Sequence, residues 1–591
     1  MSSSPSYEAH LYHESAPEPR EATDLLSKPQ YDHTLHIPDE VLLKFLLPLV
    51  FEPLATWDIC VSVKHPAFVA SQVSSNWRRI ALGAPILWSN IHVECPRLGH
   101  LYRVSEDDLR KWNVATKIRK ELVALWLSRS AQCPLDVHFD DRGSGFPMGV
   151  NPVAKGVIQF FGKYYVDLYD LILPYSSRLK VLQFDLELYP FNLPILRLLH
   201  IPPQELPSLQ RIDVNLKVPY GMDRAAIDFD IPGQRRLLKG GAFSTPSLHS
   251  LSISGSDWGD LRSLDVLRSW PLGIGAIDFS NGAAPTSLDQ LILLLKSLPE
   301  LRRCKYRLIN PQDHPLTTPS NAIHHSRLES LSLHDDPPPL GFATLLNFPS
   351  LKSLEMEYAA LKTDPDSQVH DDRGSRVVEM ILQFGSQLTS LNLVLRHDIF
   401  DQPSFHPKFF LGRLPELLHF TLIPLWKSKP DSGPNLGFLF PSLTLQLPTG
   451  PSIVHEPGVT PEGRDSSTLE ALVLEHGASA ESEQDNSESN AGRWCPKLRS
   501  LYTLLRNRTG AAEHALVDFI VSRRRNKVSP NPRNSELAPG LTQITQVDVE
   551  YSSEPKVNIL EELREKGVDM RGLTLKLKYP EYWQMYEDEV F

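Results

Sequence analysis

The segment Phe348-Pro-Ser-Leu351-Lys-Ser-Leu354-Glu-Met356 contains the pattern that decides the fold. Apolar residues stand at the first, fourth and sixth positions of 351–356, with variable residues between them. The last two alternate around one variable residue, as in a strand that buries one face. Pro349 precedes the first apolar residue by two positions and prevents a preceding helix from continuing into the strand. The segment therefore predicts a short strand with one buried face.

The same pattern returns along most of the chain, which indicates a repeat protein. Twelve copies begin at Leu179, Leu209, Leu248, Ile274, Leu301, Leu328, Leu351, Leu388, Leu417, Leu469, Leu498 and Ile544. Six of them carry a proline two residues ahead: Pro207, Pro246, Pro299, Pro349, Pro415 and Pro496. The first nine copies start 23 to 39 residues apart, a spacing typical of stacked repeats.

One such repeat cannot bury its own apolar face, so neighbouring repeats must stack. We expect an α/β fold in which residues 166–580 form an irregular leucine-rich-repeat solenoid, a horseshoe with a parallel sheet. Helical segments at 288–298 and 376–384 would lie between strands. The middle apolar residues Leu331, Leu354 and Leu391 are predicted to be buried. The alternative is an ordinary α/β domain with leucine-rich strands, which leaves the repeated proline unexplained.

Three stretches interrupt this array and are predicted to be disordered or looped. The stretch 427–464 is rich in Pro, Gly and Ser, 477–490 is acidic, and 526–539 is polar with three prolines. Residues 1–30 are also predicted to be disordered. We expect a helical module at 31–95 and a helical connector at 96–165.

The composition excludes several classes of function. The net charge is −11, and a mildly acidic chain is a poor general binder of nucleic acid. The tight basic cluster Arg523-Arg524-Arg525 with Lys527 could be a small nuclear signal or an anion patch, but we expect it to be a solvated helix end. The apolar run Leu42–Phe51 is interrupted by Lys44 and Pro48, so we expect no membrane span.

The cysteines indicate a reducing compartment. The 5 cysteines in 591 residues form neither a disulfide framework nor a CxxC metal motif. The first 29 residues lack the apolar run of a signal peptide. We therefore expect a protein of the cytoplasm or nucleus, without cofactor or bound metal.

The N-terminal part contains apolar residues at helical spacing. Ile37, Val41 and Phe45 form one stripe, with Leu42, Leu46 and Leu49 beside it. A second stretch is predicted to place Val69, Val73, Trp77, Ile80 and Ala81 on one amphipathic helix. A third, 109–129, carries Ile118, Leu122, Leu125 and Trp126 at the same spacing.

This module resembles the F-box. The resemblance rests on Ile37-Pro38-Asp39-Glu40-Val41-Leu42, on Trp77-Arg78-Arg79-Ile80 and on Leu87-Trp88-Ser-Asn-Ile91, which match that family's three motifs in order and type. The chain departs from the family in having Ile37 for the usual leucine and a longer gap before Trp77, with 52–68 expected to be an insertion. Segments Trp126–Leu135, Cys495–Leu498 and Glu562–Asp569 resemble fungal F-box-like proteins of this architecture.

The resemblance implies a substrate-recognition adaptor of a cullin–RING ubiquitin ligase. Ile37, Pro38, Leu42 and Leu43 would contact a Skp-type adaptor protein, with Glu40 beside them in the motif. Trp77, Ile80 and Trp88 would mainly hold the helices together. Leu42 and Leu43 point to neighbouring faces, so only one of them can lie fully in the internal seam. The repeat array would bind a protein substrate.

Two other interpretations of these residues remain open. All the F-box-like residues could be internal core, or the helical N-terminus could only cap the solenoid of a non-ligase interaction scaffold. No G-x-S-x-G, phosphate-binding loop or H-E-x-x-H motif occurs in the sequence, so we do not expect an enzyme.

Overall fold

A computed structural model describes most of the predicted elements. The described residues are 37–51, 65–96, 105–141, 155–187, 189, 191–217, 240–255, 269–280, 287–308, 322–358, 373–396, 399, 405, 410–425, 495–505, 511–524, 542–551 and 555–579. Several predictions lie outside this part: the disordered residues 1–30, the three interrupting stretches and the copy at 469–474.

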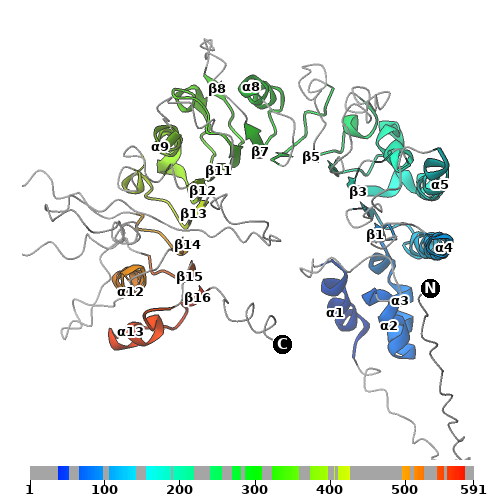
Figure 1. Cartoon of the computed structure of the whole chain (residues 1–591), viewed down its shortest axis with the longest axis horizontal. Coiled ribbons are helices and arrows are strands. Elements are labelled where there is room, and N and C mark those ends of the chain that lie inside the picture. Colours follow the sequence, from blue (N-terminus) through cyan, green and yellow to red (C-terminus); the bar gives the residue numbers. More distant parts are fainter. Residues whose placement is uncertain are drawn as a thin grey trace, which may run out of the picture.

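Fourteen strands form one parallel sheet in which almost every strand pairs with the next along the chain (Figure 1). The strands are β1 Asn90–Glu94, β2 Leu135–Asp140, β3 Leu179–Glu187, β4 Arg211–Lys217, β5 Ser250–Gly255, β6 Ala276–Phe279, β7 Arg303–Leu308, β9 Ser330–Asp335, β11 Ser353–Tyr358, β12 Ser390–Arg396, β13 His419–Leu425, β14 Ser500–Leu505, β15 Gln546–Tyr551 and β16 Thr574–Lys578. β8 (Ile323–His324) and β10 (Leu346–Asn347) form a separate two-stranded sheet. The sheet ends at β1 and β16 and does not close into a barrel.

Helices cover one side of this sheet, so the fold is mixed α/β. The chain follows an arc in which the strands line the inner side and the helices the outer side (Figure 1). The α-helices are α1 Asp39–Phe51, α2 Pro66–Val73, α3 Ser75–Gly83, α4 Glu106–Arg129, α5 Lys155–Ile172, α8 Leu288–Ser297, α9 Arg373–Phe384, α12 Ala511–Arg524 and α13 Ile559–Glu565. Short 3₁₀ helices are η2 Pro85–Trp88, η3 Leu173–Arg178, η4 Leu193–His200, η5 Pro203–Glu205, η6 Gly241–Ser244, η8 Ala343–Leu345, η9 Gly385–Gln387 and η11 Leu411–Arg413. The helices predicted at 288–298 and 376–384 are confirmed as α8 and α9.

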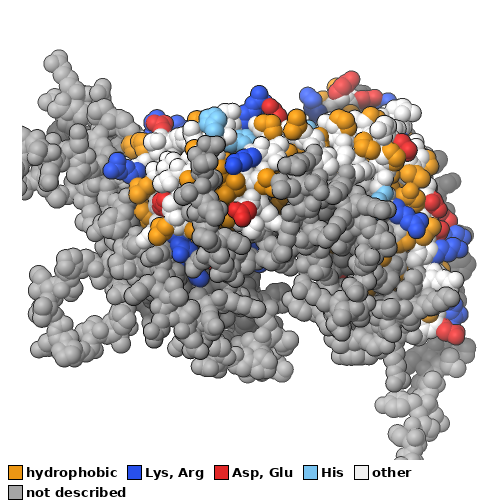
Figure 2. All heavy atoms as spheres, turned by 90° about the horizontal axis from the view of Figure 1, so that it is seen from above, with side chains coloured by type: hydrophobic (Ala, Val, Ile, Leu, Met, Phe, Trp, Pro, Cys, Tyr) orange, Lys and Arg blue, Asp and Glu red, His pale blue; other side chains and the backbone are white. Residues whose placement is uncertain are grey.

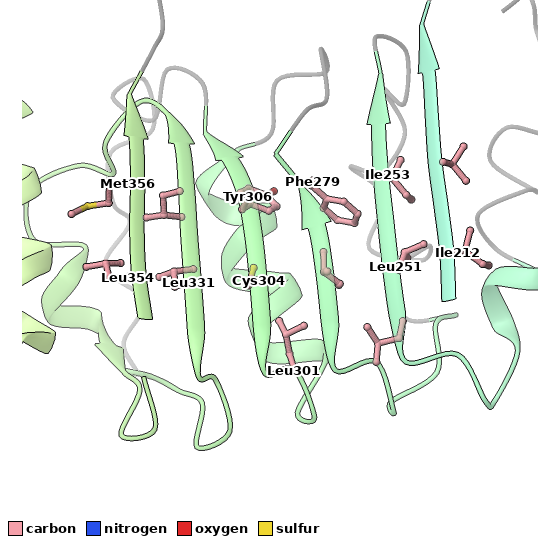
Figure 3. Packing of buried hydrophobic residues seen from close by; sticks show 14 of the residues in the cluster. Ile212, Leu251, Ile253, Phe279, Leu301, Cys304, Tyr306, Leu331, Leu354 and Met356 are labelled. Carbon is pink, nitrogen blue, oxygen red and sulfur yellow. The ribbon is translucent and has the colours of Figure 1, made fainter. Parts of the chain in front are cut away.

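The repeated apolar positions form columns that run through the sheet. Leu331, Leu354 and Leu391 are register partners on neighbouring strands and are at most 1% exposed, as predicted. Met356 lies in the second column, beside Leu333 (Figure 3). Each column places one apolar side chain per strand in the core, where a buried leucine contributes about 1.5–3 kcal/mol. Stacking therefore buries what one repeat alone leaves exposed.

The repeated proline has a role in a turn. In each of the six copies that carry it, the first apolar residue donates its N–H to the carbonyl of the residue before the proline, as Leu351 does to Phe348 at 3.1 Å and Leu209 to Leu206 at 3.2 Å. The proline is thus the second residue of a four-residue turn, where its fixed φ is favourable. Because the turn folds back just before the strand, it sets the point at which each strand joins the sheet.

Reciprocal caps that begin with a serine set the starts of α4 and α8. Ser105 accepts from the N–H of Asp108 before α4, and the Asp108 carboxylate accepts from the N–H of Ser105 in return. Ser287 and Gln290 make the same reciprocal pair at α8. Such boxes satisfy backbone donors that a helix start leaves without partners.

The sheet is longer than the repeat pattern predicts. Eleven of the twelve copies are strands of the sheet, but β1, β2 and β16 also belong to it. β1 lies within the predicted helical module 31–95 and β2 within the predicted helical connector 96–165, so the sheet begins before residue 166. β13 pairs directly with β14.

The basic cluster was also wrongly predicted to be solvated. Arg523 is 5% exposed and Arg524 is 2% exposed. Arg524 donates to the carbonyls of Asp569, Ile544 and Arg571 at 2.9, 2.6 and 2.5 Å. All three carbonyls belong to the chain that follows α12. A charged side chain can be buried there because these hydrogen bonds replace those that it would make with water.

Candidate functional site

The helical module at the N-terminus is held together by a few polar contacts. Ser74 accepts from the N–H of Trp77 and caps α3. Arg79 on α3 makes a two-pronged ion pair with Asp39 at the start of α1, at 2.6 and 2.7 Å. This pair holds the pKa of Asp39 below its ordinary value. α1 also packs against α2, so the three helices form one unit.

Two tryptophans attach this module to the rest of the chain. Trp88 is fully buried and donates its indole N–H to the carbonyl of Ala81 at 2.7 Å. Its ring meets Trp126 of α4 edge to face at 4.8 Å, and the guanidinium of Arg129 lies 4.4 Å from its centre. Phe68 of α2 stacks on Trp126 from the module side. The module therefore packs against α4.

The structure brings the predicted partner-binding residues together in this module but gives them different environments. Pro38 and Glu40 are exposed, and Ile37, Leu43 and Trp77 are half-buried. Leu42 is 2% exposed and Trp88 is 0% exposed. Leu42 thus fills the internal seam of α1, and its side chain is not available for direct contact with a partner in this conformation.

The exposed apolar side chains of the module are other residues. They are Val41, Phe45, Val69, Val73, Leu82 and Ile86, of which Phe45 is 64% and Val73 60% exposed. We call these six residues the apolar surface of the module. Val41 and Phe45 lie one turn apart on α1, and Val69 and Val73 one turn apart on α2, so each pair shares a helix face.

The sequence pattern places Val41 and Phe45 on one stripe of a helix without indicating that they are exposed, and it misplaces Val69 and Val73. It treated 69–81 as one helix and so put Val69 and Val73 on the same face as Ile80 and Ala81. Ser74 instead has extended backbone, with φ −152° and ψ 171°, and separates α2 from α3. Residues 66–68, expected to be part of an insertion, begin α2. On α4, Ile118 was expected on the packed face but is 50% exposed, while Trp112 and Val123 are buried.

A second candidate surface is a groove of about 380 Å³ on the inner side of the sheet, over β3 to β7. Small side chains form its floor, because β5 presents Ser250, Ser252 and Ser254 and β6 presents Ala276. Longer polar side chains line its sides: Asp185, Arg211, Asp213, Asn215, Asp278, Arg303 and Lys305. Since both signs of charge alternate along it, this groove suits an extended polar polypeptide rather than a nucleic-acid backbone.

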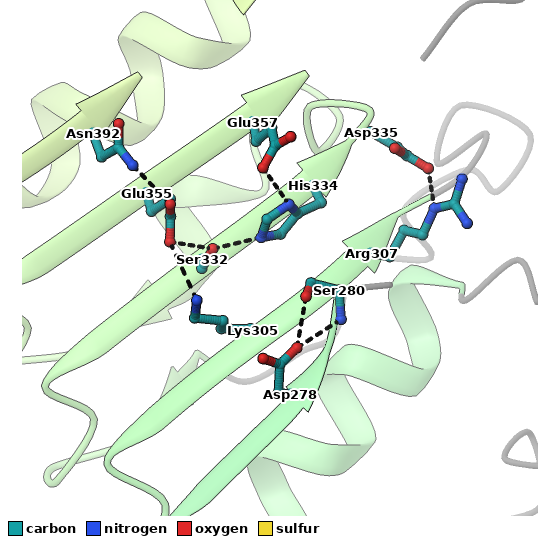
Figure 4. Close-up of polar contacts among 10 residues, drawn as sticks. All are labelled: Asp278, Ser280, Lys305, Arg307, Ser332, His334, Asp335, Glu355, Glu357 and Asn392. Carbon is teal, nitrogen blue, oxygen red and sulfur yellow. Dashed lines mark hydrogen bonds and ion pairs between the residues drawn. The ribbon is translucent and has the colours of Figure 1, made fainter. Parts of the chain in front are cut away.

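A network of polar contacts continues this surface across β9, β11 and β12 (Figure 4). Ser332 donates to Glu355 at 2.8 Å, and Asn392 donates to the other oxygen of Glu355 at 2.7 Å. His334 lies 3.0 Å from Glu357, and its hydrogen bond lowers the pKa of that carboxyl. These bonds hold the side chains in place before any partner arrives, which reduces the entropy lost on binding.

The buried cysteines are poor nucleophiles. Burial raises the pKa of Cys304 and of Cys495 to about 12, and that of Cys95 well above its ordinary value. The thiolate, not the thiol, is the reactive form, so these three side chains behave as small apolar groups in the core.

The face of the molecule seen from above in Figure 2 mixes apolar, acidic and basic side chains and carries no broad basic field within its described part. In the part of the chain that the structure describes, no helix is both long and apolar enough to cross a bilayer.

The sequence and fold of the chain were compared with those of known proteins. No protein-family model matches the chain, and no curated protein matches it. Among solved structures, the chain is similar to a protein of Bacteroides fragilis from a structural genomics programme, at 10% identity and a TM-score of 0.23. The match covers 64% of this chain and 66% of that one, just under two thirds of its length. A TM-score this low supports no inference about fold or function.

Proposed function

We propose that this protein is a substrate-recognition adaptor of a cullin–RING ubiquitin ligase, acting in the cytoplasm or nucleus. The N-terminal module would bind a Skp-type adaptor protein, and the inner side of the sheet would bind a protein substrate. The F-box resemblance of residues 37–91 and the exposed apolar surface of the module support the first part. The groove and the polar network support the second.

The apolar surface of the module is the observation that carries the proposal. Of the twelve large apolar side chains that are exposed among the described residues, six belong to it. Single exposed apolar residues are ordinary, but a concentration of them in one small unit marks an interaction site. Helices that expose residues one turn apart are well suited to a helical protein partner.

The finer architecture is part of the same proposal. Register columns, turn prolines and an arc with strands inside and helices outside together favour a leucine-rich-repeat horseshoe. In such an array the inner side offers a long binding surface to an extended or folded protein. The substrate would lie over the serine-floored groove and contact charges of both signs.

The test is binding of the full chain to a Skp-type adaptor by variants that place a charge on the apolar surface. Val41→Asp with Phe45→Asp should weaken binding by at least about 100-fold, because an unpaired carboxylate in an apolar interface costs several kcal/mol. The matched control is Ile118→Asp on α4, since Ile118 is also an exposed helical residue but lies outside the module. Equal loss in the control, or no binding by the wild type, would contradict the proposal.

One observation favours a second function, that of a non-ligase scaffold with a helical cap. β1 follows η2 after a single residue, and Trp88 packs on α4, so the module also closes the end of the sheet. In that case the chain would bind its protein partner through the sheet but would not bind a Skp-type adaptor. The same binding experiment separates the two functions.

A further inference from the structure

The first two strands of the sheet bring two histidines and a carboxylate together. His92 lies on β1, and His138 and Asp140 lie on β2. One ligand atom from each of the three lies within 4.8 Å of the other two. The chain separates His92 from the other two by more than forty residues, and the parallel pairing of His92 with His138 brings them side by side.

The three side chains lie close enough together to reach one ion after a small rearrangement. The imidazole rings of His92 and His138 are stacked, with centroids 4.3 Å apart and planes 10° from parallel. Nε2 of His92 lies 3.8 Å from Oδ2 of Asp140. Zinc ligands at about 2.0–2.1 Å in a tetrahedron are about 3.3 Å apart, so the ligand atoms must approach by about 1 Å, and a ring must rotate out of the stack so that both nitrogens point at one ion.

The nitrogen of His92 provides an independent indication. Among the described residues, Nε2 of His92 is buried and has no hydrogen-bond partner. A buried polar atom without a partner costs about 1–3 kcal/mol, and a metal ion would satisfy this one.

The surroundings also favour a cation. Glu94 is the register partner of Asp140 on β1, and Asp185 is its partner on β3. Asp136 precedes His138 by two residues and shares its side of β2. These carboxylates lie next to the triad, and Lys180 and Arg211 are the cations that act on Asp136.

We propose that His92, His138 and Asp140 bind a divalent transition-metal ion of the zinc class. Two imidazole nitrogens and one carboxylate oxygen are ligands that Zn²⁺ prefers, and three protein ligands leave a fourth position open toward the inner side of the sheet. Metal ions that prefer sulfur ligands are disfavoured, since the triad contains no thiolate.

The ion would connect the helical module to the sheet. β1 is the first strand of the sheet and pairs only with β2. It also lies directly after the module in the chain, between the module and the following strands (Figure 1). A metal with one ligand on β1 and two on β2 would therefore hold this terminal strand, and with it the module, against the array.

The experiment uses the full chain without an affinity tag, stripped of metal by chelation and titrated with Zn²⁺ in a calorimeter. Wild type should bind one ion per chain. Each of His92→Gln, His138→Gln and Asp140→Asn should bind at least about 100-fold more weakly, because loss of even an outer-shell partner costs 10–100-fold. The control is His419→Gln, since His419 is an exposed histidine at the start of β13 and should not affect binding.

Two further readouts keep the result independent of folding defects. Zn²⁺ should increase hydrogen-exchange protection of the β1 amides in wild type but not in Asp140→Asn, and circular dichroism identifies any variant that has lost its fold. Visible spectra with Co²⁺ in place of Zn²⁺ should change when Asp140 is replaced. Absence of stoichiometric binding by wild type, or unchanged binding in the folded triad variants, would overturn the proposal.

Discussion

Leu354 shows how much one side chain contributes to the sheet. It is 0% exposed and lies between Leu331 and Leu391 on the neighbouring strands. Shortening it to alanine leaves a cavity that three strands surround. We expect Leu354→Ala to reduce the free energy of unfolding by about 2–5 kcal/mol, measured by urea denaturation. Lys352→Ala, an exposed neighbour, should change it by less than about 0.5 kcal/mol, and equal effects would show that the column is not packed as described.

His65 makes the stability of the N-terminal module depend on pH. It is 2% exposed, caps α2 by accepting from the N–H of Ala67, and has its pKa lowered by burial from 6.5 to about 4. Because the folded pKa lies below the unfolded one, its stabilising contribution is complete above pH 6.5 and is lost as the pH falls toward 4. The loss should reach about 3 kcal/mol at most.

The measurement is hydrogen exchange of the α2 amides between pH 7 and 4.5. His65→Asn is the control, because asparagine can still cap the helix but does not titrate. The variant should show little pH dependence in this window. The same pH dependence in variant and wild type would mean that another group is responsible.

At the scale of the element, the end of β5 depends on a glycine. Gly255 has φ +111°, and a β-carbon there would lie 1.6 Å from the carbonyl oxygen of Leu216 on β4. We expect Gly255→Ala to cost at least about 2 kcal/mol, because the backbone must leave this conformation and β4 must move. Gly275→Ala is the matched change, since its nearest atom would be 3.7 Å away and it should be tolerated. Thermal unfolding of the two variants compares them, and similar melting temperatures would contradict the geometry.

The elements differ in how well the sequence predicts them. The leucine pattern with its proline predicted the strands from β3 to β15, because a packed column and a turn both require particular residue types. β1, β2 and β16 were missed, although Trp88-Ser-Asn-Ile91-His-Val93 fits the repeated pattern and Leu135, Val137 and Phe139 alternate as a half-buried strand should. The break at Ser74 was missed because apolar residues on both sides of it keep a helical spacing.

At the scale of the whole molecule, the candidate sites depend on contacts that the sequence does not show. The sequence predicted that the residues proposed to bind a partner share one helical module, but which side of α1 is buried depends on how α2 and α3 pack against it. The triad of His92, His138 and Asp140 arises from strand pairing across a long connection. The groove arises from short side chains on β5 and β6 between longer ones on β4 and β7. Each of these features needs the register between strands, which a single sequence leaves open.

We propose that the N-terminal module, and not the sheet, binds a Skp-type adaptor. Hydrogen exchange of the full chain with and without that adaptor tests it most directly, because it reports both binding and its location. We expect slower exchange in the amides of α1 and α2 when the adaptor is bound, with exchange in the strands β7 to β12 unchanged. No change anywhere, or protection confined to the strands, would contradict it.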